Sequence, residues 1–251
     1  RILGMARSRD APVFGADVSL QKARTATLFS STDAADFLRG IDEEVVYLSP
    51  DLSEKTRVSI PSYVDAVQGF VGAQALTDGT PFSDRAGGNL SRPFFPDGIE
   101  ANTHGPLSKS FVNNEWSVFS TGLQLDLSFN RIITHVTFAL GVQPNDATAN
   151  CVAAAPRIAN GTQIFPGSVP IYRGDRLIGG IGVSGDGVDQ DDMIAFLGVH
   201  EAGLALGGAL GNAPPAMRAD QLSPGGTPLR YVQCPQAPFI DSDEEQVCDG
   251  K

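Results

Sequence analysis

The segment Phe165–Gly198 constrains the fold more than any other part of this sequence. It begins with a short run of β-branched and aromatic residues, Val169–Tyr172, and continues into Arg173–Arg176, a hairpin turn built on a glycine. A second strand, Leu177–Val183, contains glycines where another backbone or a ligand can approach closely. The acidic residues that come next suit the positive N-terminus of a helix. The segment therefore predicts a β-hairpin followed by a helix.

Further elements are predicted from capping residues and hydrophobic periodicity. The stretch 77–114 is rich in Gly, Pro and Phe and is predicted to be a long ordered loop, because disordered linkers rarely carry so many aromatic residues. The other helices are expected at 17–31, 34–39 and 61–75, and the other strands at 2–3, 123–130 and 132–140, with a turn at Asn130-Arg131 joining the last two.

Charge and composition exclude several classes of partner. The chain of 251 residues carries a formal net charge of −11, and both nucleic acids and anionic membranes require a basic surface. The most apolar run, 193–210, is interrupted by His200 and Glu201 and is too rich in glycine for a membrane span. No Gly-x-Ser-x-Gly elbow surrounds Ser184 and no phosphate-loop ending follows the glycines, so we expect no enzyme of these classes.

Two blocks of the sequence together resemble a known family. The first contains Arg1–Arg7, Asp10-Ala11-Pro12 and Gln21–Ala26, and the second is the segment Phe165–Gly198. In this order they are similar to the GlcG/HbpS-type haem-binding family, which also occurs as the C-terminal domain of PduO-type proteins. The resemblance implies an α+β fold, an antiparallel sheet flanked by helices in a profilin-like arrangement. It also implies a homo-oligomer that binds haem b or a related tetrapyrrole.

The resemblance divides the chain into parts. Residues 1–52 and 164–212 are expected to form a split core, 53–163 a large insertion, and 213–251 an extended, proline-rich acidic tail. Such a tail is expected to wrap the parent domain or a neighbouring subunit. The family also implies a helix and a first strand before Arg1.

Three histidines are candidates for an axial haem ligand. His200 is the first candidate, because it shares the apolar face of its helix with Met193 and other large side chains that suit a porphyrin edge. The alternative is a core histidine bonded to a backbone carbonyl, or a histidine at an oligomer interface. His135 is the second candidate, with a solvent-facing position on its strand as the alternative. His104 lies in a loop where exposed histidines are common.

Other candidate contacts with a cofactor follow from the same resemblance. In the family the glycine-rich loop shapes the ligand pocket and the oligomer contact, which points to Gly180 and Gly182 here. Lys22 and Arg24, on the first helix, can pair with haem propionates. The alternative for both is an ordinary surface cation.

The cysteines and the acidic residues allow two further interpretations. Cys234 and Cys248 are spaced to close a disulfide loop in the tail, which leaves Cys151 over; the alternative is three unpaired thiols. No Cys-x-x-Cys-His is present, which excludes covalent c-type haem attachment on this chain. Clustered acids can indicate calcium, but their spacing does not fit an EF-hand and helix N-terminal acids are the ordinary explanation. These acids are Asp186, Asp189, Asp191 and Asp192.

The sequence thus predicts a haem-binding protein that acts in storage, sensing or redox chemistry, in a periplasmic or secreted setting. One alternative is a structural or assembly subunit that keeps the fold without a cofactor, favoured by the insertion and the tail. The other is an accessory subunit of an oxidoreductase.

Overall fold

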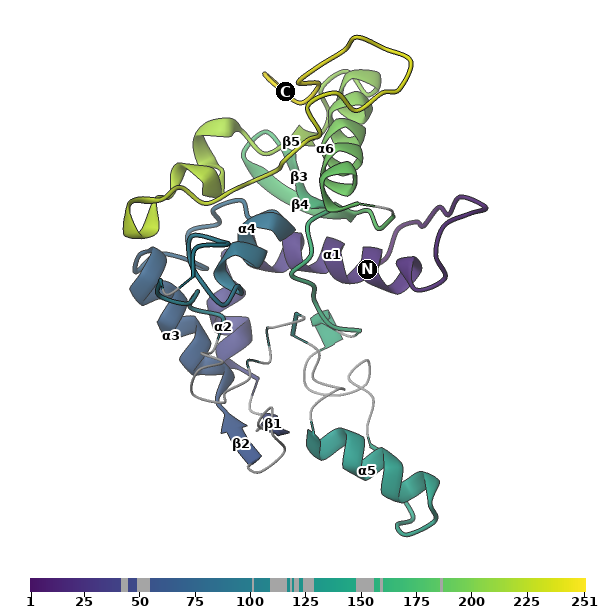
Figure 1. Ribbon diagram of the computed structural model, residues 1–251, viewed down its shortest axis with the longest axis vertical. Coiled ribbons are helices and arrows are strands. Elements are labelled where there is room, and N and C mark those ends of the chain that lie inside the picture. The colour runs from purple at the N-terminus through teal and green to yellow at the C-terminus, as the bar shows by residue number, and fades with distance from the viewer. Residues whose placement is uncertain are drawn as a thin grey trace.

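The computed structural model describes residues 1–41, 45–48, 55–100, 102–108, 117, 119, 122–123, 129–147, 156–158, 160–185 and 187–251. Over these residues the protein has an α+β fold in which an antiparallel sheet is flanked by helices, as the sequence predicts (Figure 1).

The sheet at the centre of the fold is built on the predicted hairpin. Strands β3 (Ser168–Arg173) and β4 (Arg176–Gly182) pair antiparallel, and Gly174 takes a positive φ of 62° in the turn between them. The short strand β5 (Gly211–Asn212) pairs antiparallel with the other edge of β3, which gives the order β4-β3-β5.

Two helices cover opposite faces of this sheet. Helix α1 (Gly15–Phe29) lies against Gly180 and Gly182 of β4, whose side of the strand has no side chains to hold the helix away. Helix α6 (Val188–Ala205) packs on the other face. The apolar cluster on the α6 side contains Val169, Tyr172, Ala195, Phe196, Val199, Ala213 and Tyr231. Both helices confirm the predicted elements, although α1 begins two residues before Asp17, so that Asp17 lies in the first turn.

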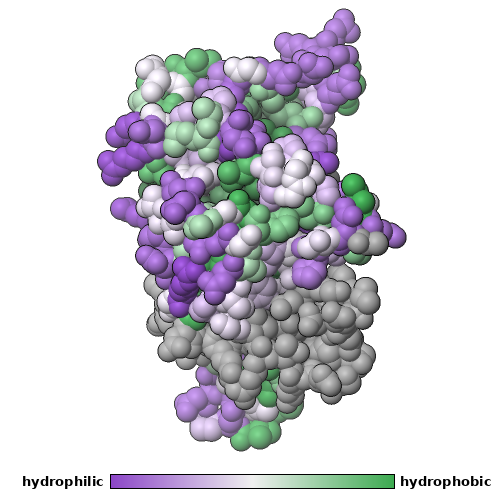
Figure 2. All heavy atoms as spheres, turned by 90° about the vertical axis from the view of Figure 1, so that its left-hand side faces the viewer, coloured by the Kyte–Doolittle hydropathy of each residue, from purple (hydrophilic) through white to green (hydrophobic). Residues whose placement is uncertain are grey.

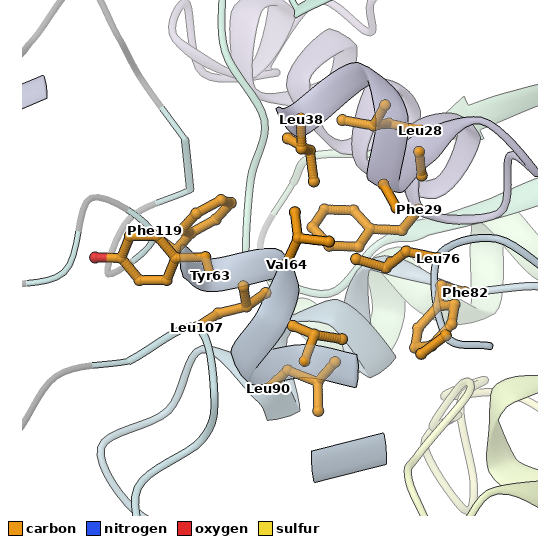
Figure 3. Packing of buried hydrophobic residues seen from close by; sticks show 14 of the residues in the cluster. Leu28, Phe29, Leu38, Tyr63, Val64, Leu76, Phe82, Leu90, Leu107 and Phe119 are labelled. Carbon is orange, nitrogen blue, oxygen red and sulfur yellow. The ribbon is translucent and has the colours of Figure 1, made fainter. Parts of the chain in front are cut away.

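A second, larger apolar cluster lies among three shorter helices (Figure 3). These are α2 (Ala34–Arg39), α3 (Ile60–Val71) and α4 (Asp84–Leu90), and the first two confirm predicted helices. Helix α4 lies inside the stretch predicted to be loop, and all seven of its residues are buried. Its N-terminus is capped by the Ser83 side chain, which accepts a hydrogen bond from the Ala86 amide at 3.1 Å.

The largest error of the sequence prediction concerns residues 132–140. They do not form a strand but belong to helix α5 (Phe129–Ala139), and the expected turn at Asn130-Arg131 lies within that helix. A short run rich in Ile, Val and Thr does not separate helix from strand by composition alone, and here the apolar residues at Ile132, Ile133 and Val136 follow helical spacing. The strand expected at 123–130 lies mostly outside the described residues.

Two smaller elements were not predicted. Strands β1 (Val45–Leu48) and β2 (Lys55–Val58) form a two-stranded antiparallel sheet. A single 3₁₀ turn, η3 (Pro156–Ile158), precedes the hairpin. The strand predicted at 2–3 is absent: residues 1–8 have no regular secondary structure and are exposed. None of the helices in the described residues is both long and apolar enough to cross a membrane.

The tail is attached to both apolar clusters. It contains the 3₁₀ turns η4 (Pro215–Met217), η5 (Ala219–Gln221) and η6 (Pro224–Gly226). Its buried residues Ala219 and Leu229 belong to the larger cluster, and Ala213 and Tyr231 to the cluster beside α6. Cys234 and Cys248 form a disulfide that closes the end of the tail. Figure 2 shows hydrophilic residues gathered at the end of the molecule where Figure 1 places this tail.

Candidate functional site

His200 lies beside a cavity at the C-terminal end of α6, which we call the His200 cavity. It has a volume of about 450 Å³ and is lined by residues of α6, β5 and the tail. These three segments lie close together in Figure 1. The imidazole is half-buried. The apolar and glycine part of the lining consists of Gly203, Leu204, Gly207, Gly208, Leu210, Gly211, Ala213, Pro214 and Pro215. A planar cofactor with an axial nitrogen ligand requires an imidazole beside a mostly apolar wall, and this cavity has both.

The chain turns sharply after α6 and so returns to form the cavity wall. Gly207 and Gly208 adopt positive φ angles of 61° and 82°, which glycine adopts without strain. The Gly208 amide donates a hydrogen bond of 2.8 Å to the Gly203 carbonyl. A Cβ atom at Gly203 would lie 2.5 Å from the Leu210 carbonyl oxygen, so the returning chain fits only against a glycine. This tight return keeps β5 next to the helix turn that carries His200.

Asn212 of β5 adds an unsatisfied acceptor to the cavity wall. Its Nδ2 donates a hydrogen bond of 3.0 Å to the Phe196 carbonyl, which fixes the orientation of the amide. Its Oδ1 is buried and has no hydrogen-bond partner among the described residues. Because this oxygen has almost no exposed surface, a ligand in the cavity does not reach it, and its missing partner costs the fold about 1–3 kcal/mol.

Arg218 is one of the two cationic side chains that line the cavity. Its Nε donates to the Ala213 carbonyl at 2.8 Å and its Nη2 to the Lys251 carbonyl at 3.1 Å. The guanidinium lies 5.1 Å from the centroid of the Phe196 ring and 5.2 Å from that of Tyr231. Burial lowers the pKa of Arg218, and the nearby Asp220 only partly opposes this effect. Within the described residues, no Asp or Glu side chain lies within ion-pair distance of this cation, and the oxygen that Nη2 contacts is a main-chain oxygen of Lys251.

The opposite end of α6 holds a group of buried ion pairs. Arg85 of α4 contacts Asp192 through Nε and Asp189 through Nη2, both at 2.5 Å. The backbone amide of Gln233 donates a hydrogen bond of 3.0 Å to Asp192 Oδ2. Burial raises the pKa of Asp192 to about 6 even though Arg85 acts to lower it. Burial likewise raises the pKa of the fully buried Asp84 well above its usual range.

Lys22, a candidate partner for a propionate, belongs to this buried group. Its ammonium donates to Asp191 at 2.8 Å and to the Val183 carbonyl at 2.9 Å, and its side chain is 3% exposed. Lys22 is therefore paired with Asp191 inside the protein and does not face a ligand at the surface. Arg24, the other candidate cation, is half-buried on α1, where burial lowers its pKa and Asp17 opposes the effect.

The candidate glycines of β4 are used for packing between α1 and the sheet. A Cβ at Gly182 would lie 2.0 Å from the Ser19 carbonyl oxygen, and one at Gly180 would lie 2.6 Å from Thr27 Oγ1. Neither glycine lines the His200 cavity. Met193 is buried on α6 but is likewise not part of the cavity lining.

The other two histidines lie elsewhere. His135 is exposed on α5, at the end of the molecule opposite to α6 in Figure 1, and its Nδ1 is 2.9 Å from Asp146 Oδ1. That contact lowers the pKa of Asp146. His104 is exposed in its loop. His200 and His135 are therefore not brought together, and they cannot share one bound group.

The calcium interpretation finds no support in the described residues. They contain no group of three or more His, Cys, Asp or Glu side chains placed to hold a metal ion. Asp189, Asp191 and Asp192 have cationic partners instead. Asp186 and Cys151 lie outside the described residues.

Sequence reasoning missed Asn212, Arg218 and Lys251 as parts of the site. Asn212 lies in a two-residue strand, and the other two are in the tail, which was expected only to wrap a neighbour. The one available signal was the presence of three cations, Arg218, Arg230 and Lys251, in an otherwise acidic tail.

Comparison with known proteins supports the resemblance to a haem-related family. Residues 129–200 match the model of the HbpS-like family, which is described as haem degrading protein HbpS-like. The match includes the hairpin and α6 as far as His200. The resemblance is therefore confirmed for this part of the chain, and it indicates a haem-related function. No curated protein and no solved structure matches the chain.

Proposed function

We propose that this protein binds haem b, or a closely related tetrapyrrole, in the His200 cavity with the His200 imidazole as axial ligand. The observation that carries the proposal is the position of His200, which is half-buried at the edge of a cavity of about 450 Å³ with a largely apolar lining. Cavities of roughly 300–1,000 Å³ with such linings are typical of sites for cofactors and other small molecules.

The residues around the cavity fit this group in two ways. The imidazole supplies a nitrogen ligand, and the apolar and glycine wall suits a porphyrin face. When bound, haem supplies an iron centre whose redox and ligand chemistry serves storage, sensing or redox roles. The chain's own part is to hold the imidazole in place and to exclude bulk water with the returning wall Gly207–Ala213.

A haem titration followed by visible absorption tests the proposal. The wild-type protein is expected to give a saturable Soret band, and His200→Ala is expected to lose it or shift it. His135→Ala is the matched control, because His135 is exposed on α5 and should leave the spectrum unchanged. A Soret band that is identical in wild type and His200→Ala would remove His200 as the ligand.

The same sample separates binding from turnover. The matching family model is described as haem degrading, so the Soret band should also be followed over time with a reductant present. A stable band supports storage, sensing or redox function, which is the role we propose. Steady loss of the band by the wild type, but not by heat-denatured protein, would instead assign haem degradation.

We also propose that the protein assembles as a homo-oligomer, and one observation favours an assembly role. Several large apolar side chains of α5 and the turn after it are 40–73% exposed, and large exposed apolar patches are typical of interaction surfaces. They are Ile132, Ile133, Val136, Phe138, Leu140 and Val142. Light scattering should give a mass above that of one chain, and Ile133→Asp should lower it. A monomeric wild type would contradict this proposal.

An extracytoplasmic location completes the proposal. The Cys234–Cys248 disulfide supports it, because such bonds persist mainly in oxidising compartments. Fractionation of the native cells, with an antibody to the chain, should find the protein outside the cytoplasm. Recovery in the cytoplasmic fraction with reduced thiols would contradict it.

A further inference from the structure

The His200 cavity carries two cations and no acid among the described residues. Arg218 and Lys251 both line it, and none of the described lining residues is Asp or Glu. This is unusual in a chain whose net charge is −11. An apolar wall on one side and two positive charges on the other give the cavity two chemically different parts.

We propose that Arg218 and Lys251 form a carboxylate-binding end of the His200 cavity. The ligand that fits is then amphipathic, with an apolar body against the glycine and proline wall and acidic groups at one edge. This inference rests on the proposed function for the place of the ligand, but it concerns different residues and a different part of the molecule bound.

Arg218 is held in place before any ligand arrives. Two carbonyls, those of Ala213 and Lys251, accept from its Nε and Nη2, and the Phe196 and Tyr231 rings lie against its plane. Nη1 makes no contact of this kind with the described residues. A guanidinium fixed in this way loses little side-chain freedom when an anion binds, and the fork geometry of arginine favours carboxylates.

Arg218 is buried, and none of the described Asp or Glu side chains is in contact with it. The residue is only 9% exposed, and the described residues surround its guanidinium with main-chain oxygens and aromatic rings. Because a buried cation is unfavourable unless anions or acceptors surround it, an acidic group of the ligand would stabilise it further. Burial also lowers the pKa of Arg218, in agreement with an incompletely neutralised cation.

Lys251 extends the same end of the cavity. Its Nζ donates to the Val247 carbonyl at 2.6 Å, and its own carbonyl accepts from Arg218. These contacts connect both cations to the disulfide-closed end of the tail. Two cations at one end suit a ligand with two acidic groups at one edge, and a single carboxylate would leave one of them without a partner.

Metal-free porphyrins test this inference without using the iron ligand. Protoporphyrin IX carries two carboxylates, and its dimethyl ester has the same body without the charges. Binding of both to the full chain is measured by porphyrin fluorescence. The wild type should bind the acid about tenfold or more tightly than the ester, because a charge-assisted hydrogen bond contributes about 1.5–3 kcal/mol. Raising the salt concentration should weaken binding of the acid and leave the ester unaffected.

Variants assign the preference to these two residues. Lys251→Met and Arg218→Gln should each reduce the ratio of acid to ester affinity severalfold, and the double variant should abolish it. Arg176→Gln is the charge-matched control, since Arg176 is exposed in the hairpin turn and should keep the wild-type ratio. Circular dichroism checks the fold of Arg218→Gln, and Lys251→Met carries the test if that variant unfolds.

The outcomes separate this inference from haem ligation by His200. Equal binding of acid and ester by the wild type, or an unchanged ratio in Lys251→Met and the double variant, overturns the carboxylate site even if His200 ligates haem. A strong preference for the acid together with no Soret change in His200→Ala overturns the ligand assignment and leaves the carboxylate site standing. If neither porphyrin binds, both proposals are wrong.

Discussion

The two ends of α6 are surrounded by different chemistry. At its N-terminal end every acidic residue of the first turns has a cationic partner: Asp191 contacts Lys22, and Asp189 and Asp192 contact Arg85. At its C-terminal end His200 lies by a cavity whose cations have no Asp or Glu partner among the described residues. Completed charge pairs are typical of structure, and incomplete ones are typical of a site that awaits a ligand. One helix thus joins a structural end to a binding end.

Removing a cation from the structural end should have the largest effect on stability. Arg85→Ala leaves Asp192 buried without its partner, and loss of one member of a buried pair costs about 3–5 kcal/mol. Urea unfolding measures the change. Arg39→Ala is the control, because the Arg39–Asp65 pair is exposed and should cost less than about 1 kcal/mol. Equal losses in the two variants would remove the distinction between a structural and a binding end.

The pH dependence of stability should also originate at this end. Burial raises the pKa of Asp192 to about 6 from its ordinary value of 3.8, so between these values the folded state holds a proton that the unfolded state has released. Stability should therefore fall as pH rises from about 4 to about 6, by up to roughly 3 kcal/mol for this group. Asp84, also raised by burial, acts in the same direction.

Asp192→Asn isolates this contribution. Asp10, Asp33 and Asp146 have lowered pKa values and act in the opposite direction, but they are little buried or exposed, and the variant leaves them unchanged. Urea unfolding at pH 4, 5, 6 and 7 should show a smaller fall in the variant than in the wild type. Parallel curves would mean that Asp192 titrates alike in both states.

The packing between α1 and the sheet should be nearly as important for stability as the buried ion pairs. One methyl group added at this contact should lower the free energy of unfolding. Gly182→Ala places a Cβ 2.0 Å from the Ser19 carbonyl oxygen, and forced overpacking costs about 1–3 kcal/mol. Gly179→Ala, in the same strand, meets nothing within 4 Å and is the matched control. Thermal unfolding should separate the two variants. If Gly182→Ala instead lowers haem affinity at unchanged stability, the glycine serves the ligand and not the packing.

Local signals account for what could be predicted of the fold. The hairpin depends on a turn glycine and on flanking β-branched residues, and α2 ends at Gly40 as expected, so both were found from neighbouring residues alone. The run 132–140 failed because β-branched residues suit a strand by composition while their spacing suits α5. In so short a run the composition and the spacing indicate different elements, and packing decides between them.

The site depends on contacts between residues that are distant in sequence. His200 was found because helical spacing places it on one face with Met193 and other apolar residues, but Lys22 was not recognised as buried, since Asp191 is 169 positions away. Arg218 and Lys251 are 33 positions apart and meet only because the tail folds back onto α6. No periodicity in the sequence encodes that return, so the charged end of the cavity could not be predicted.

The smallest effect on stability is expected at the binding end itself. His200→Ala removes a half-buried imidazole that makes no hydrogen bond to the described residues, so the free energy of unfolding in urea should change by no more than about 0.5 kcal/mol. The same variant should lose its axial contact with haem, which separates function from stability at one position. A loss above about 2 kcal/mol would instead make His200 a core histidine that holds α6 in place, and α6 would then be structural along its whole length.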